Sequence, residues 1–274
     1  MRVRSMALEG KTKKLYPLTT VVDPQDVVTW HNGESAPMEG KGMLTVRTVA
    51  PLFRLLNSRG RPTVFERTIP GGKYLARCAE TIKFEVVVRF RNEEKGSLHM
   101  RRPELPIGTL PEPLVEFYLK SHGEVFDGIE LPGDDPLVYK WSEDGVYVVA
   151  ANGKEHPLNN TFVPFVVEGW KLADIRDKLE EMALTDATIV RDGLATVGLD
   201  MGDVKLEYGF MWVLDQGGLR MELALVEAPS NDEWRVRDSE GRERSKQNIR
   251  NGKKPVDAIE DYEFVANAVE RIAI

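Results

Sequence analysis

A short stretch in the last third of the chain, residues 203–209, alternates charged and apolar side chains. In a β-strand successive side chains point to opposite faces, so Asp203, Lys205 and Glu207 would share one face and the apolar residues the other. A half-buried strand with a solvated charged face is the ordinary explanation of this pattern. The chemical explanation is that two carboxylates on one face bind Mg²⁺, while the lysine offsets charge on phosphate oxygens during phosphoryl transfer.

Residues 8–16 combine a glycine and several lysines in an expected strand–turn–strand. Gly10 would let the backbone approach a polyphosphate closely, and Lys11 and Lys13 would supply positive charge to it. The spacing is not that of a Walker motif, and a lysine-rich hairpin is more often simply exposed. By itself the segment is therefore a weak signal for nucleotide binding.

Three further residues are candidates for binding an anion: Arg89 and Ser97 for a phosphate monoester, and Arg235 for closing over an anionic substrate. Arg89 ends a run of β-branched residues, Ser97 follows a glycine in a turn, and Arg235 lies in a polar segment. The planar guanidinium group can donate two hydrogen bonds to phosphate, and a Gly-Ser turn can add further donors. Each residue taken alone is equally well explained by a strand end or a turn in solvent.

The composition argues against several other classes of protein. With one cysteine and four histidines in 274 residues, neither an internal disulfide nor a Cys/His zinc site is expected. A formal net charge of −7 disfavours binding to nucleic acid. Because no apolar run is long enough to span a membrane and the N-terminus lacks a secretion signal, we expect a cytoplasmic protein with small-molecule partners. The oligomeric state stays open, and a homo-oligomer is one option.

The elements that must position these residues alternate between sheet-forming and helical stretches. Strands are expected at residues 19–30 and 84–91, and helices at residues 42–59, 170–192 and 256–274. The proline-rich residues 102–113 predict an extended connecting segment, and the polar residues 230–254 a functional or mobile loop. This alternation predicts a mixed α+β fold in two lobes.

Taken in order, seven short motifs resemble those of the SAICAR synthetase family, and the resemblance covers most of the chain. Residues 110–118 nearly match the family's Leu-Pro-Glu-Pro-Leu-Val-Glu-Phe-Tyr, and residues 203–209 resemble its Asp-Phe-Lys-Leu-Glu-Phe-Gly. The remaining similar motifs lie at residues 9–13, 41–67, 86–97, 135–138 and 245–250. No single motif decides the matter, but their collinear order does.

The resemblance implies a ligase that joins carboxyaminoimidazole ribotide to L-aspartate with ATP and Mg²⁺, through an acyl phosphate. It implies a β-rich N-terminal nucleotide-binding lobe at residues 1–88 and a larger substrate- and metal-binding lobe at residues 89–274, with ATP in the cleft between them. The implied nucleotide-binding residues are Gly10, Lys11, Lys13 and Glu207; the catalytic residues Lys205 and Asp203; the ribotide-binding residues Arg89, Ser97 and Arg235; and the metal ligands Glu207, Asp203 and Glu227.

Several positions depart from the family pattern. Val226 stands where the family has a metal-binding aspartate, so that Glu227 or Asp232 would have to replace it. Tyr139 replaces an asparagine, and residues 139–164 match no family motif. Two alternatives therefore stay open: a divergent ligase of the same fold with another nucleotide or amine, and a nucleotide-binding protein without catalysis.

Overall fold

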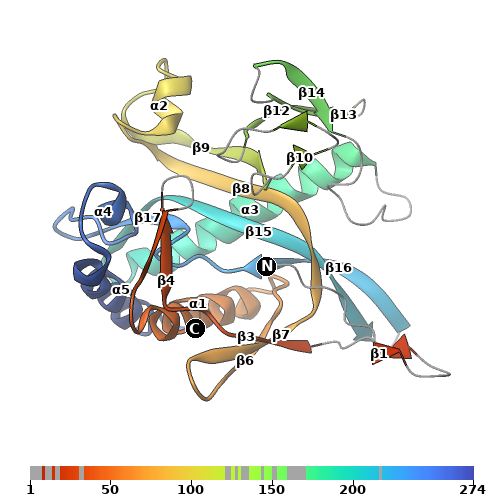
Figure 1. The fold of residues 1–274 in the computed structure, drawn as a ribbon, viewed down its shortest axis with the longest axis horizontal. Helices are drawn as coiled ribbons and strands as arrows, with labels where there is room; N and C mark the ends of the chain where they lie inside the picture. The colour runs from red at the N-terminus through yellow and green to blue at the C-terminus, as the bar shows by residue number, and fades with distance from the viewer. Residues whose placement is uncertain are drawn as a thin grey trace.

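The structure is a computed structural model that describes residues 8–9, 14–15, 19–30, 34–120, 125–126, 129–130, 136–142, 145–149, 153–158, 171–215 and 218–274. Within these residues the fold is a mixture of antiparallel sheets and helices (Figure 1). The mixed α+β class predicted from the sequence is thus confirmed.

The central element is a five-stranded antiparallel sheet. Its strands are β8 (Ala79–Asn92), β9 (Gly108–Leu119), β15 (Leu199–Asp215), β16 (Gly218–Glu227) and β17 (Trp234–Asp238). The order is β16-β15-β8-β9, and β17 pairs with the first part of β15. Strand β9 therefore forms one edge of the sheet, whereas β8 and β15 lie inside it.

The described residues form three longer helices and two short helices. The helices are α1 (Lys41–Ser58), α2 (Ser97–Arg101), α3 (Leu172–Ala195), α4 (Gln247–Arg250) and α5 (Pro255–Val269). Of the three longer helices, α3 packs on the five-stranded sheet, and α1 and α5 pack against each other. In Figure 1, α3 runs alongside β8 and β15, and α1 and α5 lie together near the C-terminus. No helix in the described ranges is long and apolar enough to cross a membrane.

Smaller antiparallel sheets complete the described part of the chain. Two of them have three strands: β3 (Thr19–Val22), β7 (Lys73–Arg77) and β6 (Phe65–Ile69), and β12 (Val138–Ser142), β13 (Gly145–Val149) and β14 (Glu155–Leu158). The others are two-stranded pairs: β1 (Leu8–Glu9) with β2 (Lys14–Leu15), β4 (Val27–Trp30) with β5 (Glu34–Pro37), and β10 (Val125–Phe126) with β11 (Ile129–Glu130).

The three predicted helices are confirmed, and two predicted loops contain strands. Residues 102–113 were expected to be a connector, but β9 begins at Gly108 and runs through two prolines. Proline is tolerated there because β9 is an edge strand, where a missing N–H need not break the ladder. The polar residues 230–254 contain β17 and α4. The lobe boundary predicted at residue 88 falls within the continuous strand β8, and the division into lobes stays a prediction.

A buried polar cluster fastens α3 to the sheet and to the chain after α1. The carboxylate of Asp186 in α3 is fully buried and accepts hydrogen bonds from Arg61 Nε at 2.5 Å and from the hydroxyl of Tyr208 at 2.9 Å. Burial raises the pKa of Asp186, although the hydrogen bond from Arg61 opposes this. A buried acceptor that loses its donor becomes costly, so both partners are needed.

The first prediction concerns this cluster. Tyr208→Phe leaves one oxygen of Asp186 without its donor and should lower the free energy of unfolding by about 1–3 kcal/mol. Urea unfolding measures this, with the exposed Tyr139→Phe as the matched control, for which a change within about 0.5 kcal/mol is expected. Equal stabilities of Tyr208→Phe and the wild type would contradict the assigned role of the hydroxyl.

Candidate active site

The charged side chains predicted on β15 lie on the sheet face that points away from α3. Val204, Leu206 and Tyr208 are at most 1% exposed and belong to the same core as α3. Asp203 lies opposite Arg89 of β8, and Glu207 lies opposite Glu85. Paired residues share a face in an antiparallel sheet, so the period-two prediction for residues 203–209 is confirmed and extended to neighbouring strands.

One end of this face holds a cluster of arginines. Arg89 donates from Nε to Glu116 at 2.5 Å and from Nη1 to Asp203 at 3.1 Å, and its Nη2 lies 3.5 Å from Ser97 Oγ. Arg235 Nη1 lies 3.0 Å from the same oxygen of Asp203. The structure thus brings together all three residues that the sequence singled out for an anion, and Asp203 joins two of them.

The tight turn before α2 brings Ser97 to this cluster. A side chain at Gly96 would lie 3.0 Å from the carbonyl oxygen of Glu93 and 3.6 Å from Arg235 Nη1. The distance to Arg235 is an ordinary van der Waals contact, but the contact with Glu93 is tighter than a Cβ atom normally makes, so a larger residue would require a small shift there. The glycine in the predicted Gly-Ser turn therefore has a packing reason at this position.

The other end of the face combines lysines and glutamates. Lys205 Nζ lies 2.9 Å from Glu85 and 3.0 Å from Glu207, and Lys120 Nζ lies 2.6 and 2.5 Å from the two oxygens of Glu207. Burial alone would raise the pKa of Glu207, but the two ammonium groups outweigh it and lower that pKa to about 2. Glu207 is therefore ionised throughout the physiological range.

Glu227 lies on β16, directly opposite Glu207 of β15. Its side chain reaches solvent. The surrounding protein and the carboxylates of Glu207 and Glu233 raise the pKa of Glu227. This end of the face therefore has more carboxylate than positive charge close by, and an added cation would be stabilised there.

The residues at this end suit Mg²⁺ only together with a substrate. Among the described residues no group of three or more Asp, Glu, His or Cys side chains is placed to hold a metal ion. Mg²⁺ commonly binds through one or two carboxylates, waters and substrate phosphates rather than in a complete protein cage. Glu207 and Glu227 can supply those two carboxylates.

Val226, which departs from the family pattern, and Asp232, one of its two candidate replacements, both have clear structural roles. Val226 is the unpaired residue of a bulge in β16, opposite Glu207 and Tyr208 of β15. A Cβ atom at Gly209 would lie 2.8 Å from Val226 Cγ2. It contributes an apolar contact and no oxygen ligand. Asp232 forms an ion pair with Lys41 at 2.7 Å and accepts a hydrogen bond from Tyr262 at 2.5 Å. These contacts already occupy the carboxylate of Asp232.

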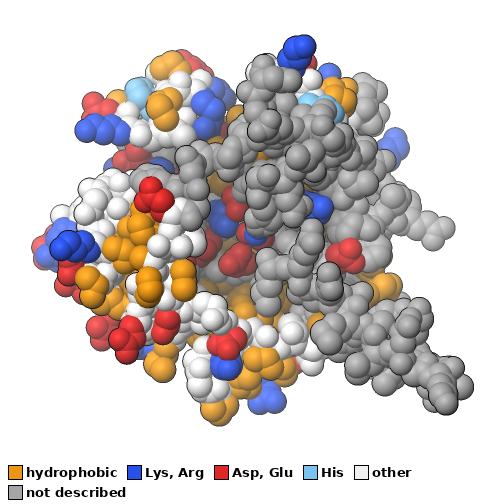
Figure 2. Space-filling model, in the orientation of Figure 1, with side chains coloured by type: hydrophobic (Ala, Val, Ile, Leu, Met, Phe, Trp, Pro, Cys, Tyr) orange, Lys and Arg blue, Asp and Glu red, His pale blue; other side chains and the backbone are white. Residues whose placement is uncertain are grey.

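The two ends of the face are separated by a distance that suits a small phosphorylated substrate. Asp203 and Glu207 are four residues apart along β15, which corresponds to about 13 Å. Lys205 lies between them, and Val87 of β8 lies opposite Lys205. Figure 2 shows acidic and basic side chains side by side in a hollow near the centre of the view.

Four residues of the site were not found from chemistry in the sequence: Glu85, Glu116, Tyr118 and Lys120. The last three alternate along β9 and its end, as Asp203, Lys205 and Glu207 do along β15. That period-two pattern is visible in the sequence, but the prolines just before it led to the prediction of a connecting segment and not of a strand. The predicted loop residues Gly10, Lys11 and Lys13 lie outside the described residues, between the paired strands β1 and β2.

In this α+β fold, an arginine cluster at one end of a sheet face and acidic groups with lysines at the other suit the binding of a phosphorylated small molecule. A sequence profile described as SAICAR synthetase matches residues 6–128. A phosphoribosylaminoimidazole-succinocarboxamide synthase of Pyrococcus abyssi is 32% identical over 85% of this chain and 83% of its own length.

Solved structures agree with this relationship. A SAICAR synthetase in complex with ADP is 29% identical and superimposes with a TM-score of 0.68 over 95% of this chain and 96% of its own. The SAICAR synthetase of Pyrococcus horikoshii is 27% identical, with a TM-score of 0.65 over 93% and 94% of the two chains. The chain belongs to the SAICAR synthetase family, as the motifs indicated.

The second prediction concerns the charge balance around Glu207. Its pKa of about 2 in the folded protein lies below the ordinary glutamate value of about 4.3. The stabilisation from its ionised form is therefore present above about pH 4.3 and is lost as the pH falls towards about 2. Urea unfolding in EDTA should show Glu207→Gln less stable than the wild type at pH 7, with a gap that narrows below about pH 4. A gap that is the same at pH 7 and pH 3 would contradict the assigned ion pairs.

Proposed function

We propose that this chain catalyses the ATP-dependent condensation of carboxyaminoimidazole ribotide with L-aspartate to give SAICAR, ADP and phosphate. One observation carries the proposal: a sheet face has an arginine cluster at Arg89 and Arg235, an acidic group at Glu207 towards the other end, and Lys205 between them. A ribotide has a phosphate at one end and the reacting carboxylate at the other, and the face offers a matching group to each. A family member that binds ADP supports the nucleotide role.

In the proposed mechanism a carboxylate oxygen of the ribotide attacks the γ-phosphorus of ATP and ADP leaves. The aspartate amine then attacks the acyl carbon, phosphate leaves, and the nitrogen loses a proton as the amide forms. Arg89, Ser97 and Arg235 hold the ribotide phosphate, so the imidazole carboxylate is directed towards Lys205. Phosphoryl transfer depends mainly on such positioning and on charge stabilisation.

The other end of the face would bind the polyphosphate. Lys205 offsets charge on the transferring group, and Gly10, Lys11 and Lys13 would cradle the polyphosphate from the N-terminal lobe of residues 1–88. Glu207 and Glu227 would hold Mg²⁺, which would offset negative charge on the phosphate oxygens. Lys120 and Lys205 both form ion pairs with Glu207. A metal ion bound to Glu207 would replace Lys120 as the positive charge that balances this carboxylate.

A divergent ligase of the same fold is the second candidate. It is favoured by Val226, which provides no metal ligand, and by Tyr139, which is 40% exposed beside a pocket at the edge of the sheet. Such an enzyme would use ATP and a carboxylate with another amine or nucleotide. A protein that only binds nucleotide has no use for the paired lysines around Glu207, which disfavours that alternative.

The experiment that tests the proposal measures ADP release by the purified protein. ATP, Mg²⁺, carboxyaminoimidazole ribotide and L-aspartate are each omitted in turn, and the amide product is identified by mass spectrometry. We expect ADP release and SAICAR formation only with the complete mixture. ADP release that requires the ribotide but does not respond to aspartate would point to another amine, and no ADP release despite ATP binding would point to another acceptor.

A matched pair of arginines on β17 tests the phosphate-binding end. Arg235 pairs with Asp203 at 3.0 Å, whereas Arg237, on the same face of the strand, pairs with Glu93 at 2.9 Å. Arg235→Ala should raise the KM for the ribotide by about ten- to a hundredfold, because a charge-assisted hydrogen bond to phosphate is lost. Arg237→Ala should change it less than about threefold. Equal effects of the two substitutions would place the phosphate elsewhere.

A further inference from the structure

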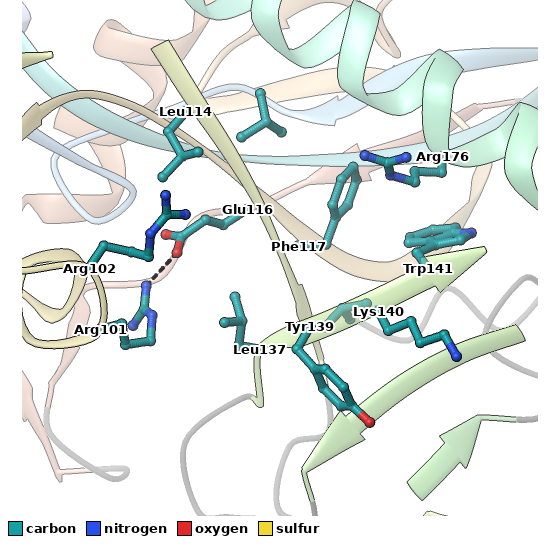
Figure 3. A pocket seen from close by; sticks show the side chains of 12 residues that line it. Arg101, Arg102, Leu114, Glu116, Phe117, Leu137, Tyr139, Lys140, Trp141 and Arg176 are labelled. Carbon is teal, nitrogen blue, oxygen red and sulfur yellow. Dashed lines mark hydrogen bonds and ion pairs between the residues drawn. The ribbon is translucent and has the colours of Figure 1, made fainter. Parts of the chain in front are cut away.

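A pocket of about 640 Å³ lies at the outer edge of β9, where α2 and β12 approach the strand. Figure 3 shows Arg101 and Arg102 at one side of this pocket and the carboxylate of Glu116 pointing towards Arg101. Glu116 also reaches Arg89 in the candidate active site. This carboxylate is therefore shared between the arginine cluster and the pocket behind it.

We propose that Glu116 and Arg101 are positioning residues that hold the guanidinium group of Arg89 in place for the ribotide phosphate. The proposal rests on the proposed function, because it takes Arg89 as a phosphate ligand. Neither residue contacts the substrate itself in this scheme. Each acts through Arg89, and the class of ligand they help to select is a sugar phosphate monoester.

The contacts of Glu116 form a bridge between two arginines. Its Oε2 accepts from Arg89 Nε at 2.5 Å, and its Oε1 accepts from Arg101 Nη2 at 2.6 Å. The side chain of Glu116 is 9% exposed and that of Arg89 is 7% exposed. Burial would raise the pKa of Glu116, but the two guanidinium groups keep it below the ordinary value. Glu116 is thus a fixed negative charge between two positive ones.

Tyr118 closes this bridge into a ring of contacts. Its hydroxyl lies 2.7 Å from Arg101 Nη2, 3.1 Å from Glu116 Oε2 and 3.2 Å from Arg89 Nη2. A hydroxyl can donate one hydrogen bond and accept others, so Tyr118 can serve all three groups at once. The guanidinium of Arg101 also lies over the Tyr118 ring, 5.8 Å from its centroid.

The same contacts place helix α2. Ser97 at the start of α2 approaches Arg89, and Arg101 at its end binds Glu116. A helix of five residues is too short to be stable by itself, so its position depends on such tertiary contacts. Positioning of Arg89 and positioning of Ser97 are therefore expected to depend on one another.

The physical reason for this arrangement lies in the flexibility of arginine. A free arginine side chain loses rotamer entropy when it is fixed in one conformation. In this protein Glu116, Asp203 and Tyr118 receive the donors that point into the protein, so the orientation of Arg89 is set before a ligand arrives. Binding groups that are oriented in advance hold a phosphate more tightly, because less entropy is lost on binding.

The test uses Glu116→Gln, which keeps the size of the side chain. A glutamine presents an N–H₂ group to one of the two arginines and cannot satisfy both. We expect the KM for the ribotide to rise by about tenfold or more, with kcat within about twofold and the KM for ATP unchanged. Arg101→Ala should act in the same direction with a smaller effect, because Arg101 reaches Arg89 only through Glu116 and Tyr118.

Glu112→Gln is the matched control, since Glu112 is exposed and lies four residues earlier on the same strand. It should leave all three kinetic constants unchanged. Circular dichroism and the urea midpoint of each variant show whether it is folded. Glu116→Asp, which keeps the charge but shortens the reach, should recover part of the loss that Glu116→Gln causes.

Direct binding of ribose 5-phosphate, measured by calorimetry, separates failure of this proposal from failure of the proposed function. Weaker binding to both Arg89→Ala and Glu116→Gln supports the positioning role. Weaker binding to Arg89→Ala with wild-type binding to Glu116→Gln would overturn it and leave the phosphate site intact. If Arg89→Ala binds ribose 5-phosphate as tightly as the wild type does, Arg89 is not a phosphate ligand, and the proposed phosphate site and the positioning role are both overturned. A fall in kcat or a rise in the KM for ATP in Glu116→Gln would also overturn the proposal.

Discussion

Charges that are largely removed from water need an opposite charge within hydrogen-bond distance, and this requirement organises the functional face of the sheet. Arg89 and Glu207, with side-chain exposures of 7% and 5%, would each be costly alone. Arg89 is balanced by Glu116 and Asp203, and Glu207 by Lys120 and Lys205. Each of these two buried charges therefore has opposite charges beside it, and any ligand must enter an arrangement that is already nearly neutral in its buried part.

This arrangement can be rigid because the opposite face of the sheet is an apolar core. Val204 and Leu206 of β15 pack into the core that also contains Leu179 of α3. Each residue of β15 is thus fixed from behind, and its charged neighbours are held at a constant spacing along the strand. The cluster of Asp186 with Arg61 and Tyr208 adds a polar attachment between α3 and the same strand. The stability of the fold and the positioning of the site therefore both depend on the alternation of apolar and charged side chains along β15.

Much of this could be predicted from the sequence, and the remainder depends on strand register. The alternation in residues 203–209 is local, so it is enough by itself to predict a strand with one charged face. The helical periodicity that led to α3 is equally local. Glu85, Glu116 and Lys120 could not be assigned partners in this way, because their contacts come from the pairing of β9, β8 and β15. Pro111 and Pro113 concealed β9, since the sequence does not show which strand is at the edge.

The bulge at Val226 bears on the metal site proposed at Glu207 and Glu227. Gly209 cannot carry a side chain there, because a Cβ atom would lie 2.6 Å from the carbonyl oxygen of Glu80 and 2.8 Å from Val226 Cγ2. Val226 therefore packs closely against the backbone of β15, an environment that favours an apolar residue. An aspartate at that position would add a further negative charge to a region where Glu227 already has neighbouring carboxylates. With valine, Glu207 and Glu227 are the two ligands left to the metal in the proposed site, and phosphate oxygens of the nucleotide would complete its shell. Binding of metal and binding of nucleotide should consequently be more strongly linked in this chain than in relatives that have the aspartate.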